Sequence, residues 1–246
     1  MDDFNRLGSG ANSAHDNLKN KEVSKNVDTK LDLSKIVQHK FSEREYFKEV
    51  YPKKQIVLHH TVSGNSVNGD INWWLKDGKR IGTCVLIARD GTIHQVFSSK
   101  YWAYHLGENG KDHQKVGLPY QRNDMKSIGI EIDSWGGLKF DTSINEWRSS
   151  TGTIVPKDRV EVYDKKFRGY SGFEKYTPEQ IESVRQLLVY WGKVYDIPLD
   201  YNDCMWNISK KALSGWSGIF SHVSFRSDKS DAHRQPELIE MLKSLK

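Results

Sequence analysis

The distribution of apolar and polar residues divides the chain into predicted strands and helices separated by polar loops. An apolar, β-prone run begins at Gln55 and stops abruptly at two adjacent histidines, His59 and His60, which predicts a buried strand. Residues 82–97 contain two β-rich runs joined at Arg89-Asp-Gly, where Asp-Gly supplies the positive φ of a tight hairpin turn. Residues 127–133 form another apolar run and predict a further strand.

One long amphipathic helix is predicted after Tyr176. Thr177-Pro-Glu-Gln supplies an N-cap, a proline at the first helical position and a glutamine three residues after the cap. Pro198 marks the end of this helix. Between them, apolar residues recur at spacings of three and four: Ile181, Val184, Leu188, Trp191 and Tyr195. One face of the helix must therefore cover a sheet.

Shorter helices are predicted within residues 31–51, where Ser42 and Glu45 form a capping-box pair, after Asp70, and from about Pro236 to the end of the chain. Together the elements predict one α/β domain over residues 31–246, with a central mixed β-sheet of about five or six strands flanked by helices.

Two segments fall outside this regular pattern. Residues 1–30 are polar and lack apolar periodicity, so they predict a disordered N-terminal tail. Residues 136–176 combine Gly-Gly with short β-prone patches and predict an elaborated loop or small hairpin insertion.

Composition and charge narrow the class of protein without naming a partner. The chain is 37% apolar and contains eight Trp, eleven Tyr and nine Phe, which is typical of a globular protein with an aromatic-rich core or cleft. A net charge of +5 favours anionic partners. Nucleic acid is not expected, because no basic run alternates with aromatic residues and no zinc-finger or helix-turn-helix motif is present.

The amino terminus predicts how the protein is delivered. Met1-Asp-Asp-Phe-Asn carries acids where a signal peptide needs basic residues, and no stretch of about 18 apolar residues follows. We therefore expect synthesis in the cytoplasm without a signal peptide, no membrane insertion, and export by another route. Cys84 and Cys204 are far apart and lie outside any CxxC pattern, so no disulfide framework is expected.

Two groups of residues near opposite ends of the predicted domain carry metal-binding chemistry. Alternation along a strand sends His59 and His60 to opposite faces, so one of them points into a site and the other into packing or solvent. A catalytic zinc commonly takes three His, carboxylate or thiolate ligands and leaves a fourth position for water. His59, His222 and Asp231 would supply that set. Spacing alone leaves three rivals open: His60, Asp228 and His233.

The strand at residues 127–133 adds two carboxylates, Glu131 and Asp133, which alternation places on one face. A carboxylate in a buried strand is costly unless it is paired or takes part in chemistry. The strand is therefore a second source of candidate catalytic groups.

These residues resemble those of the zinc-dependent N-acetylmuramoyl-L-alanine amidases, a family that includes amidase-type phage lysozymes and peptidoglycan recognition proteins. The resemblance runs from about Ile56 to the last predicted helix. The matching pieces, in chain order, are Val-Leu-His59-His-Thr, Leu-Ile-Ala-Arg-Asp-Gly-Thr-Ile, Ala103-Tyr-His105-Leu-Gly107, Asn123 ahead of Ser-Ile-Gly-Ile-Glu131, Thr-Pro-Glu-Gln, and His222 with Lys229-Ser-Asp231.

The resemblance implies a zinc site and two catalytic residues. It makes His59, His222 and Asp231 the zinc ligands. Glu131 falls where many members place the general base, and Lys229 falls where the family uses a lysine to stabilise the transition state.

Substrate-binding roles follow from the same comparison. His105 matches a histidine at the cleft, and Thr61, Trp102 and Asn123 lie in or beside matching pieces. His60 falls at a position that the family fills variably, so it is not expected to be a ligand.

The chain departs from the family pattern at two places near the site. Thr83-Cys84 stands where some relatives have a Tyr-His pair, which gives more weight to Glu131 as the base. Asp231 is followed by Ala232, where the family usually has Asp-Pro, so the choice between Asp231 and Asp228 stays open.

The implied activity is hydrolysis of the amide bond between N-acetylmuramic acid and L-alanine in peptidoglycan. We expect a monomeric phage-type endolysin that reaches the cell wall after release by a holin or another route. The alternatives are a catalytically inactive peptidoglycan-binding recognition module and a cytosolic cell-wall recycling amidase. An unrelated zinc peptidase or deacetylase is disfavoured, because the chain has no HExxH helix.

Overall fold

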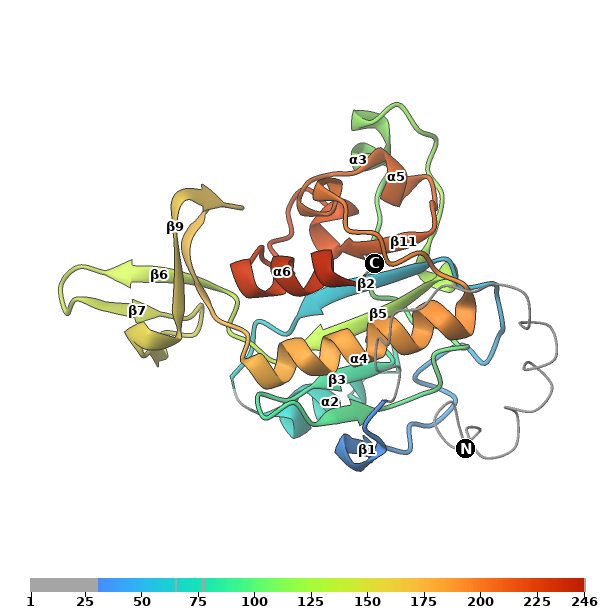
Figure 1. Ribbon diagram of the computed structural model, residues 1–246, viewed down its shortest axis with the longest axis horizontal. Helices are drawn as coiled ribbons and strands as arrows, with labels where there is room; N and C mark the ends of the chain where they lie inside the picture. The colour runs from blue at the N-terminus through green and yellow to red at the C-terminus, as the bar shows by residue number, and fades with distance from the viewer. Residues whose placement is uncertain (1–30, 65, 77, 246) are drawn as a thin grey trace.

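Within the part of the chain that the structure describes, six strands form a central mixed sheet (Figure 1). This computed structural model describes residues 31–64, 66–76 and 78–245, so the predicted tail at residues 1–30 lies outside the described residues. In sheet order the strands are β1 (Ile36–Gln38), β4 (Ile93–Gln95), β3 (Val85–Ile87), β5 (Ser127–Ile132), β2 (Gln55–His60) and β11 (Gly218–Ser221). All neighbours pair in parallel except β3 and β4, which form the predicted hairpin. The predicted fold class, a single α/β domain, is confirmed.

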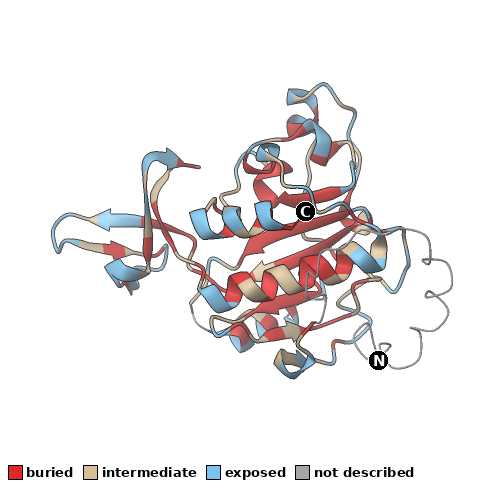
Figure 2. Ribbon diagram, in the orientation of Figure 1, coloured by how far each residue is buried: buried red, intermediate tan, exposed pale blue. Residues whose placement is uncertain are grey.

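Both faces of β2 are covered, which explains its unbroken apolar run. Helices α4 (Pro178–Tyr195) and α6 (Pro236–Ser244) lie across one face of the sheet (Figure 1). Ile56 packs in the main core, whereas its neighbour Val57 packs in a second cluster with Leu106. Every residue of β2 is buried, and Figure 2 shows the central strands as the buried centre of the molecule. The register of β2 is therefore fixed from both sides.

The predicted helices are mostly found where their capping signals place them. Thr177 caps α4 in a capping box with Gln180, and α6 begins at Pro236. Helix α2 (Val67–Trp74) begins after Ser66, which is earlier than the predicted cap at Asp70. None of the described helices is both long and apolar enough to cross a membrane. The remaining helices and 3-10 turns are short: η3 (Leu33–Lys35), α3 (Gly110–Lys115), η4 (Asp124–Lys126), η5 (Lys157–Arg159), η6 (Asp203–Trp206), α5 (Lys210–Leu213) and η7 (His222–Ser224).

The helix predicted within residues 31–51 is wrong. This described segment contains η3, the edge strand β1 and an extended stretch, with no α-helix. Its aromatic residues contact rings of the domain instead of following a helical stripe. The Tyr46 ring stacks on Phe97 at 5.1 Å, and Phe47 stacks on Trp102 at 3.9 Å. Tertiary stacking has overridden the local capping signal.

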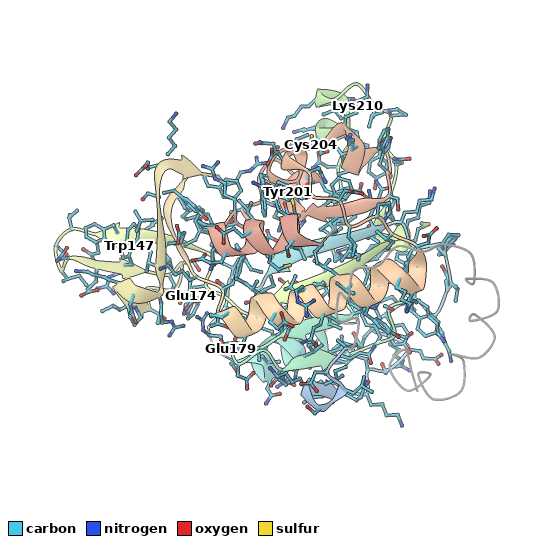
Figure 3. All side chains as sticks on the ribbon, viewed as in Figure 1. Trp147, Glu174, Glu179, Tyr201, Cys204 and Lys210 are labelled. Carbon is cyan, nitrogen blue, oxygen red and sulfur yellow. The ribbon has the colours of Figure 1, made fainter. Side chains whose placement is uncertain are left out.

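Residues 137–174 form a second sheet that projects from the body of the molecule (Figure 1). Only an elaborated loop or small hairpin was expected over residues 136–176. Its core is Leu138, Trp147, Val155 and Val160; Trp147 is labelled in Figure 3. In the described chain this sheet is antiparallel and has five strands, in the order β8 (Ile154–Val155), β7 (Glu146–Arg148), β6 (Gly137–Asp141), β10 (Tyr170–Glu174) and β9 (Val160–Phe167).

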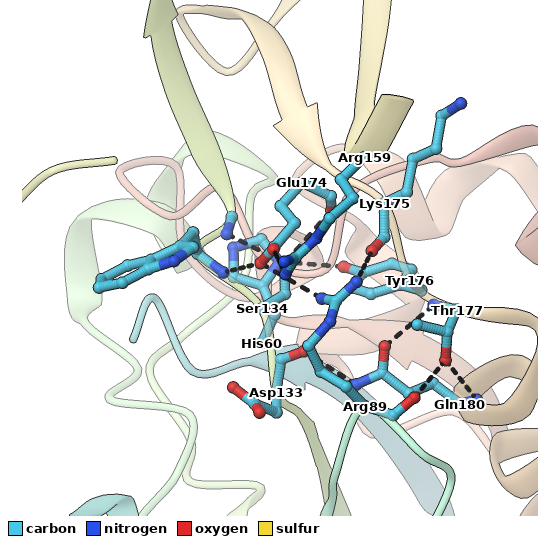
Figure 4. Close-up of polar contacts among 12 residues, drawn as sticks. His60, Arg89, Asp133, Ser134, Arg159, Glu174, Lys175, Tyr176, Thr177 and Gln180 are labelled. Carbon is cyan, nitrogen blue, oxygen red and sulfur yellow. Dashed lines mark hydrogen bonds and ion pairs between the residues drawn. The ribbon is translucent and has the colours of Figure 1, made fainter. Parts of the chain in front are cut away.

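A fully buried carboxylate, Glu174, joins the projecting sheet to the central domain (Figure 4). Its Oε1 pairs with the Arg159 guanidinium, and its Oε2 lies 3.3 Å from Arg89 Nη1 and accepts the backbone N–H of Trp135 at 2.7 Å. A buried charge is tolerated when it is paired and hydrogen-bonded in this way. The projecting sheet is therefore attached through a paired, hydrogen-bonded carboxylate as well as through the chain itself.

The start of α4 lies beside this junction and offers a test of the fold. The Thr177 hydroxyl accepts the Gln180 N–H at 3.1 Å and donates to the Arg89 carbonyl at 2.7 Å. Thr177→Ala removes both bonds, so we expect it to lower the free energy of unfolding by about 1–2 kcal/mol in denaturant titrations. Thr177→Ser keeps the hydroxyl and is the matched control. Equal stability of the Ala and Ser variants would contradict this account.

Candidate metal centre

Three side chains converge where β2 and β11 end. His59 Nδ1 lies 3.1 Å from His222 Nδ1 and 3.2 Å from Asp231 Oδ2, and His222 Nδ1 lies 2.9 Å from the same oxygen. One ligand atom from each residue lies within 4.8 Å of the others, and all three residues are buried. Among the described residues this is the one such group of metal-ligand side chains.

The sheet and one loop bring these ligands together. β11 and β2 run parallel and in register up to the residues just before His222 and His59, so the two histidines emerge side by side at the same edge. The chain then turns back, and the backbone N–H of Val223 donates to the Asp231 carbonyl at 3.0 Å. This bond brings the Asp231 carboxylate to the two imidazoles.

Asp228, the rival carboxylate, has a different partner. Arg226 donates to it from Nε at 2.9 Å and from Nη2 at 2.6 Å, and the Asp228 side chain is 60% exposed. Asp231, by contrast, is buried between the two histidines. Of the two carboxylates, Asp231 is therefore the one that lies with His59 and His222.

The rival histidines belong to a buried aromatic cluster. His60 Nδ1 lies 2.9 Å from the Tyr176 hydroxyl, which accepts the backbone N–H of His233 at 3.1 Å. The His233 ring in turn lies 2.8 Å from the Tyr163 hydroxyl. His60 and His233 therefore pack under the projecting sheet and do not join the three converging ligands.

Burial and neighbouring groups hold His59 and Asp231 in their metal-binding protonation states. Burial, together with the neighbouring His222, lowers the pKa of His59 to about 4. Burial opposes ionisation of Asp231, but the adjacent His222 and His59 hold the pKa of its carboxyl well below the usual range. At neutral pH the group thus presents a neutral imidazole and a carboxylate, which are the forms that ligate a metal.

This donor set fits zinc. Two imidazole nitrogens and one carboxylate oxygen match the three-ligand catalytic zinc sites that keep a fourth position for water or substrate. Hard cations such as calcium and magnesium prefer all-oxygen sites and fit the two imidazoles poorly.

Glu131 and Lys229 lie at the edge of the ligand group. Glu131 is paired in register with His59 across β5 and β2, so its side chain leaves the same face of the sheet. Burial raises the pKa of Glu131 well above its usual range, and the nearby Asp231 adds to this increase. The Lys229 ammonium is close enough to lower the pKa of both Glu131 and His59 by its charge.

His105 contacts a ligand histidine. Its Nδ1 lies 2.9 Å from His59 Nε2, and its Nε2 lies 2.7 Å from the Ser127 hydroxyl. Burial lowers the pKa of His105 well below its usual range, so the ring is neutral. Both ring nitrogens are occupied by protein groups, which leaves the substrate-contact role predicted for His105 without a ring nitrogen to carry it.

Of the other predicted substrate-binding residues, Trp102 and Asn123 are buried, whereas Thr61 is partly exposed. Trp102 is buried against Phe47 and donates its indole N–H to Glu49 at 3.3 Å. Asn123 is also buried, and its side-chain amide donates to Glu108 at 2.7 Å.

Thr61 lies at the end of β2 and is partly exposed. Its hydroxyl accepts the backbone N–H of Ser134 at 3.1 Å. Of these three residues, Thr61 is the nearest to His59 in sequence, because it directly follows the strand that carries His59.

One contact to His222 and one contact to His105, the neighbour of His59, were not predicted. Ser127 binds His105, and the Leu106 carbonyl lies 2.8 Å from His222 Nε2. A backbone carbonyl has no residue-type signature, so sequence reasoning could not have identified Leu106. The Ser127 hydroxyl could have been suspected only once the neighbour of His105 was known.

The chain also matches a known protein family. Residues 49–236 match a family model described as N-acetylmuramoyl-L-alanine amidase. No curated protein matches the chain significantly at the level of sequence.

Several solved structures are similar to the chain at low sequence identity. The amidase LysC from Clostridium intestinale URNW is 14% identical over 85% of this chain and 95% of that one, with a TM-score of 0.42. The hydrolase AmiA from Staphylococcus aureus, in complex with its ligand, is 13% identical over 94% and 88%, with a TM-score of 0.44. The amidase AmiD from E. coli, in complex with a substrate, is 16% identical over 79% and 59%, with a TM-score of 0.47.

Metal titration distinguishes the two candidate carboxylates. Asp231→Ala removes a converging ligand, so we expect zinc affinity to fall by more than the roughly 10- to 100-fold that loss of an outer partner costs. Asp228→Ala breaks only the pair with Arg226 and should leave the affinity unchanged. Competition with a chromophoric chelator measures both constants. A larger loss for Asp228→Ala would mean that the ligand assignment is wrong.

Proposed function

The chain belongs to the N-acetylmuramoyl-L-alanine amidase family, and we propose that it cleaves the bond between N-acetylmuramic acid and L-alanine in peptidoglycan with a zinc ion held by His59, His222 and Asp231. The convergence of these three buried side chains is the observation that carries the proposal. Zinc in such a site supplies Lewis acidity, which acidifies a water and polarises the amide carbonyl.

Glu131 is the general base in this proposal. It would take a proton from the attacking water and pass it to the leaving nitrogen of L-alanine. Its register pairing with His59 supports this role, because both side chains leave the same face of the sheet where the strands end. Burial of its carboxyl raises its pKa, which makes the ionised form a stronger base.

Lys229 is the electrostatic partner of the reaction. Its ammonium would stand near the scissile carbonyl oxygen, where negative charge develops as the water attacks. The charge of Lys229 lowers the pKa of both His59 and Glu131, which supports a position near both groups.

We further propose a lysin role for residues 31–246 as one catalytic unit that acts on the cell wall after release. The net charge of +5 would favour approach to an anionic wall. A recognition module without activity is the alternative from another class. The complete ligand set together with Glu131 favours the enzyme, because a binding module needs neither.

The projecting sheet offers a second surface for the same substrate. A groove of about 640 Å³ on it is lined by Lys139, Lys166 and Arg168 together with the rings of Phe140 and Tyr170, and none of its lining residues is acidic. Arg168 also donates to the Val223 carbonyl at 3.2 Å, on the loop that carries Asp231. Cations suit the carboxylates of a stem peptide, and aromatic rings suit sugar faces, so we assign this groove to peptidoglycan beyond the cleaved bond.

Product analysis tests the activity directly. Incubation with purified peptidoglycan should release new L-alanine amino termini, and a chelator should abolish that release. New reducing sugar ends would indicate a glycosidase instead. Binding without any product would favour the recognition module.

The catalytic roles are tested by a pair of variants. Glu131→Gln should keep zinc but reduce turnover by about 10²- to 10⁴-fold, the usual contribution of a general base. His222→Ala should lose zinc. Glu240→Gln, an exposed carboxylate on α6, is the control and should behave as the parent protein. Full activity of Glu131→Gln would refute the general-base assignment.

The groove is tested by two adjacent lysines on β9. Lys166 lines the groove, whereas Lys165 does not. We expect Lys166→Ala to raise KM for intact peptidoglycan several-fold and to leave turnover of a small muramoyl-peptide unchanged. Lys165→Ala should leave both unchanged. Equal effects of the two variants would mean that general surface charge, not this groove, is responsible.

A further inference from the structure

The loop that leads to the carboxylate ligand is held by an arginine of the projecting sheet. We call residues 223–230, which end at Asp231, the ligand loop. The Arg168 guanidinium donates from Nη2 to the Val223 carbonyl at 3.2 Å and from Nη1 to the Ser227 carbonyl at 3.4 Å. We propose that Arg168 is a positioning residue that fixes the ligand loop and thereby sets the place of Asp231. This inference rests on the metal site of the proposed function.

Only the first half of the ligand loop is fixed by packing. Residues 223–225 are buried, and Phe225 packs in the same hydrophobic cluster as Leu106. Residues 226–230 are half-buried or exposed. Because this second half leads directly to Asp231, polar contacts with neighbouring elements, and not the apolar core, decide the path by which the chain reaches the ligand.

Ser227, in the second half of the loop, is bound through all three of its polar groups. Its N–H donates to Asp112 Oδ2 at 3.2 Å, and its hydroxyl accepts from Lys115 Nζ at 2.6 Å. Both of these partners belong to α3, whereas the partner of the Ser227 carbonyl is Arg168. The ligand loop is therefore held by both α3 and the projecting sheet.

Arg168 differs from the two α3 residues because it also binds the start of the loop. One planar guanidinium, with donors in fixed positions, spans the carbonyls of Val223 and Ser227. The Val223 N–H in turn donates to the Asp231 carbonyl at 3.0 Å. Arg168 thus fixes the start and the exposed half of the loop relative to each other, and Val223 alone separates it from the backbone of Asp231.

The backbone at this position is unfavourable for an arginine. Arg168 and Gly169 connect β9 to β10 with φ of 48° and 89°, both in the left-handed region. Two-residue hairpin turns of this kind favour Asn-Gly or Gly-Gly, because the Cβ of most L residues crowds the backbone there. Residues in such conformations persist where the surrounding structure holds them, often at functional sites. The two bonds to the ligand loop are what an asparagine at this position would lose.

Arg168→Asn separates the loop contacts from the fold of the projecting sheet. Asparagine suits this turn, so the melting temperature should stay close to that of the parent. In the metal-free variant, the amides of the ligand loop should exchange with deuterium faster than in the metal-free parent. Zinc affinity in chelator competition should fall about 10-fold without being lost, because the sheet still presents His59 and His222.

Turnover separates this role from the groove, which Arg168 also lines. Arg168→Asn should lower kcat for a small muramoyl-peptide by about 10- to 100-fold, because Asp231 is no longer held in place. A role confined to the groove would raise KM for intact peptidoglycan and leave that kcat unchanged.

Two further variants complete the comparison. Arg168→Lys keeps the charge but lacks the planar fork, so its zinc affinity should lie between those of the parent and Arg168→Asn. Arg148→Asn is the control, because Arg148 lies on β7 of the same sheet and pairs with Asp141 at 2.9 Å. It removes one positive charge and should match the parent in amide exchange, zinc affinity and kcat.

Unchanged exchange of the ligand-loop amides in a folded Arg168→Asn protein would overturn the proposal, and so would unchanged zinc affinity. An equal loss in Arg148→Asn would attribute the effect to the charge of the sheet and would also count against Arg168. If Arg168→Asn does not fold, Arg168→Lys provides the same comparison with the parent. The exchange measurement needs no metal, so a parent protein that binds no zinc would refute the proposed function, while the exchange rates would still decide whether Arg168 holds the loop.

Discussion

Parallel pairing of β11, β2 and β5 is the constraint on which the site depends. In parallel strands the carboxyl ends meet at one edge, so His222, His59 and Glu131 follow one another across that edge without any contribution from a loop. A shift of β2 by one residue would turn His59 to the opposite face and bring His60 forward. The burial of every residue of β2 prevents that shift. The apolar core thus determines which histidine reaches the metal site, although it contains no catalytic group.

The polar contacts around His59 and His222 contribute both to the stability of the fold and to the metal site. An imidazole nitrogen that is buried without a partner costs about 1–3 kcal/mol, so the Nε2 atoms of His59 and His222 need partners for stability alone. The partners that they have, the His105 ring and the Leu106 carbonyl, also turn both Nδ1 atoms toward Asp231. Stability and metal binding therefore favour the same ring orientations. The folded chain can organise the site in advance, so that little reorganisation opposes metal binding.

How far the sequence predicts this arrangement depends on the range of the interactions involved. His59 could be predicted because the apolar run of its strand stops there, and α4 because its capping signals are local. The segment at residues 31–51 could not, since stacking of Tyr46 and Phe47 on distant rings decides its conformation. Asp231 and Asp228 lie three residues apart and have the same side chain, so only their partners in the fold separate them: two histidines for Asp231 and Arg226 for Asp228. Four of the five strands in the projecting sheet have five residues or fewer, and no single strand's sequence indicates which strand it pairs with.

The adjacent histidines show why burial alone does not identify a metal ligand. Burial lowers the pKa of both His59 and His60 to about 4, so both are neutral and both offer a lone pair at neutral pH. They differ in what lies next to Nδ1. At His60 it is a tyrosine hydroxyl, which completes a neutral hydrogen bond. At His59 it is a second imidazole and a carboxylate, a set of acceptors that a cation can bring together. One peptide unit and the alternation of a strand separate a packing residue from a residue of the proposed metal site.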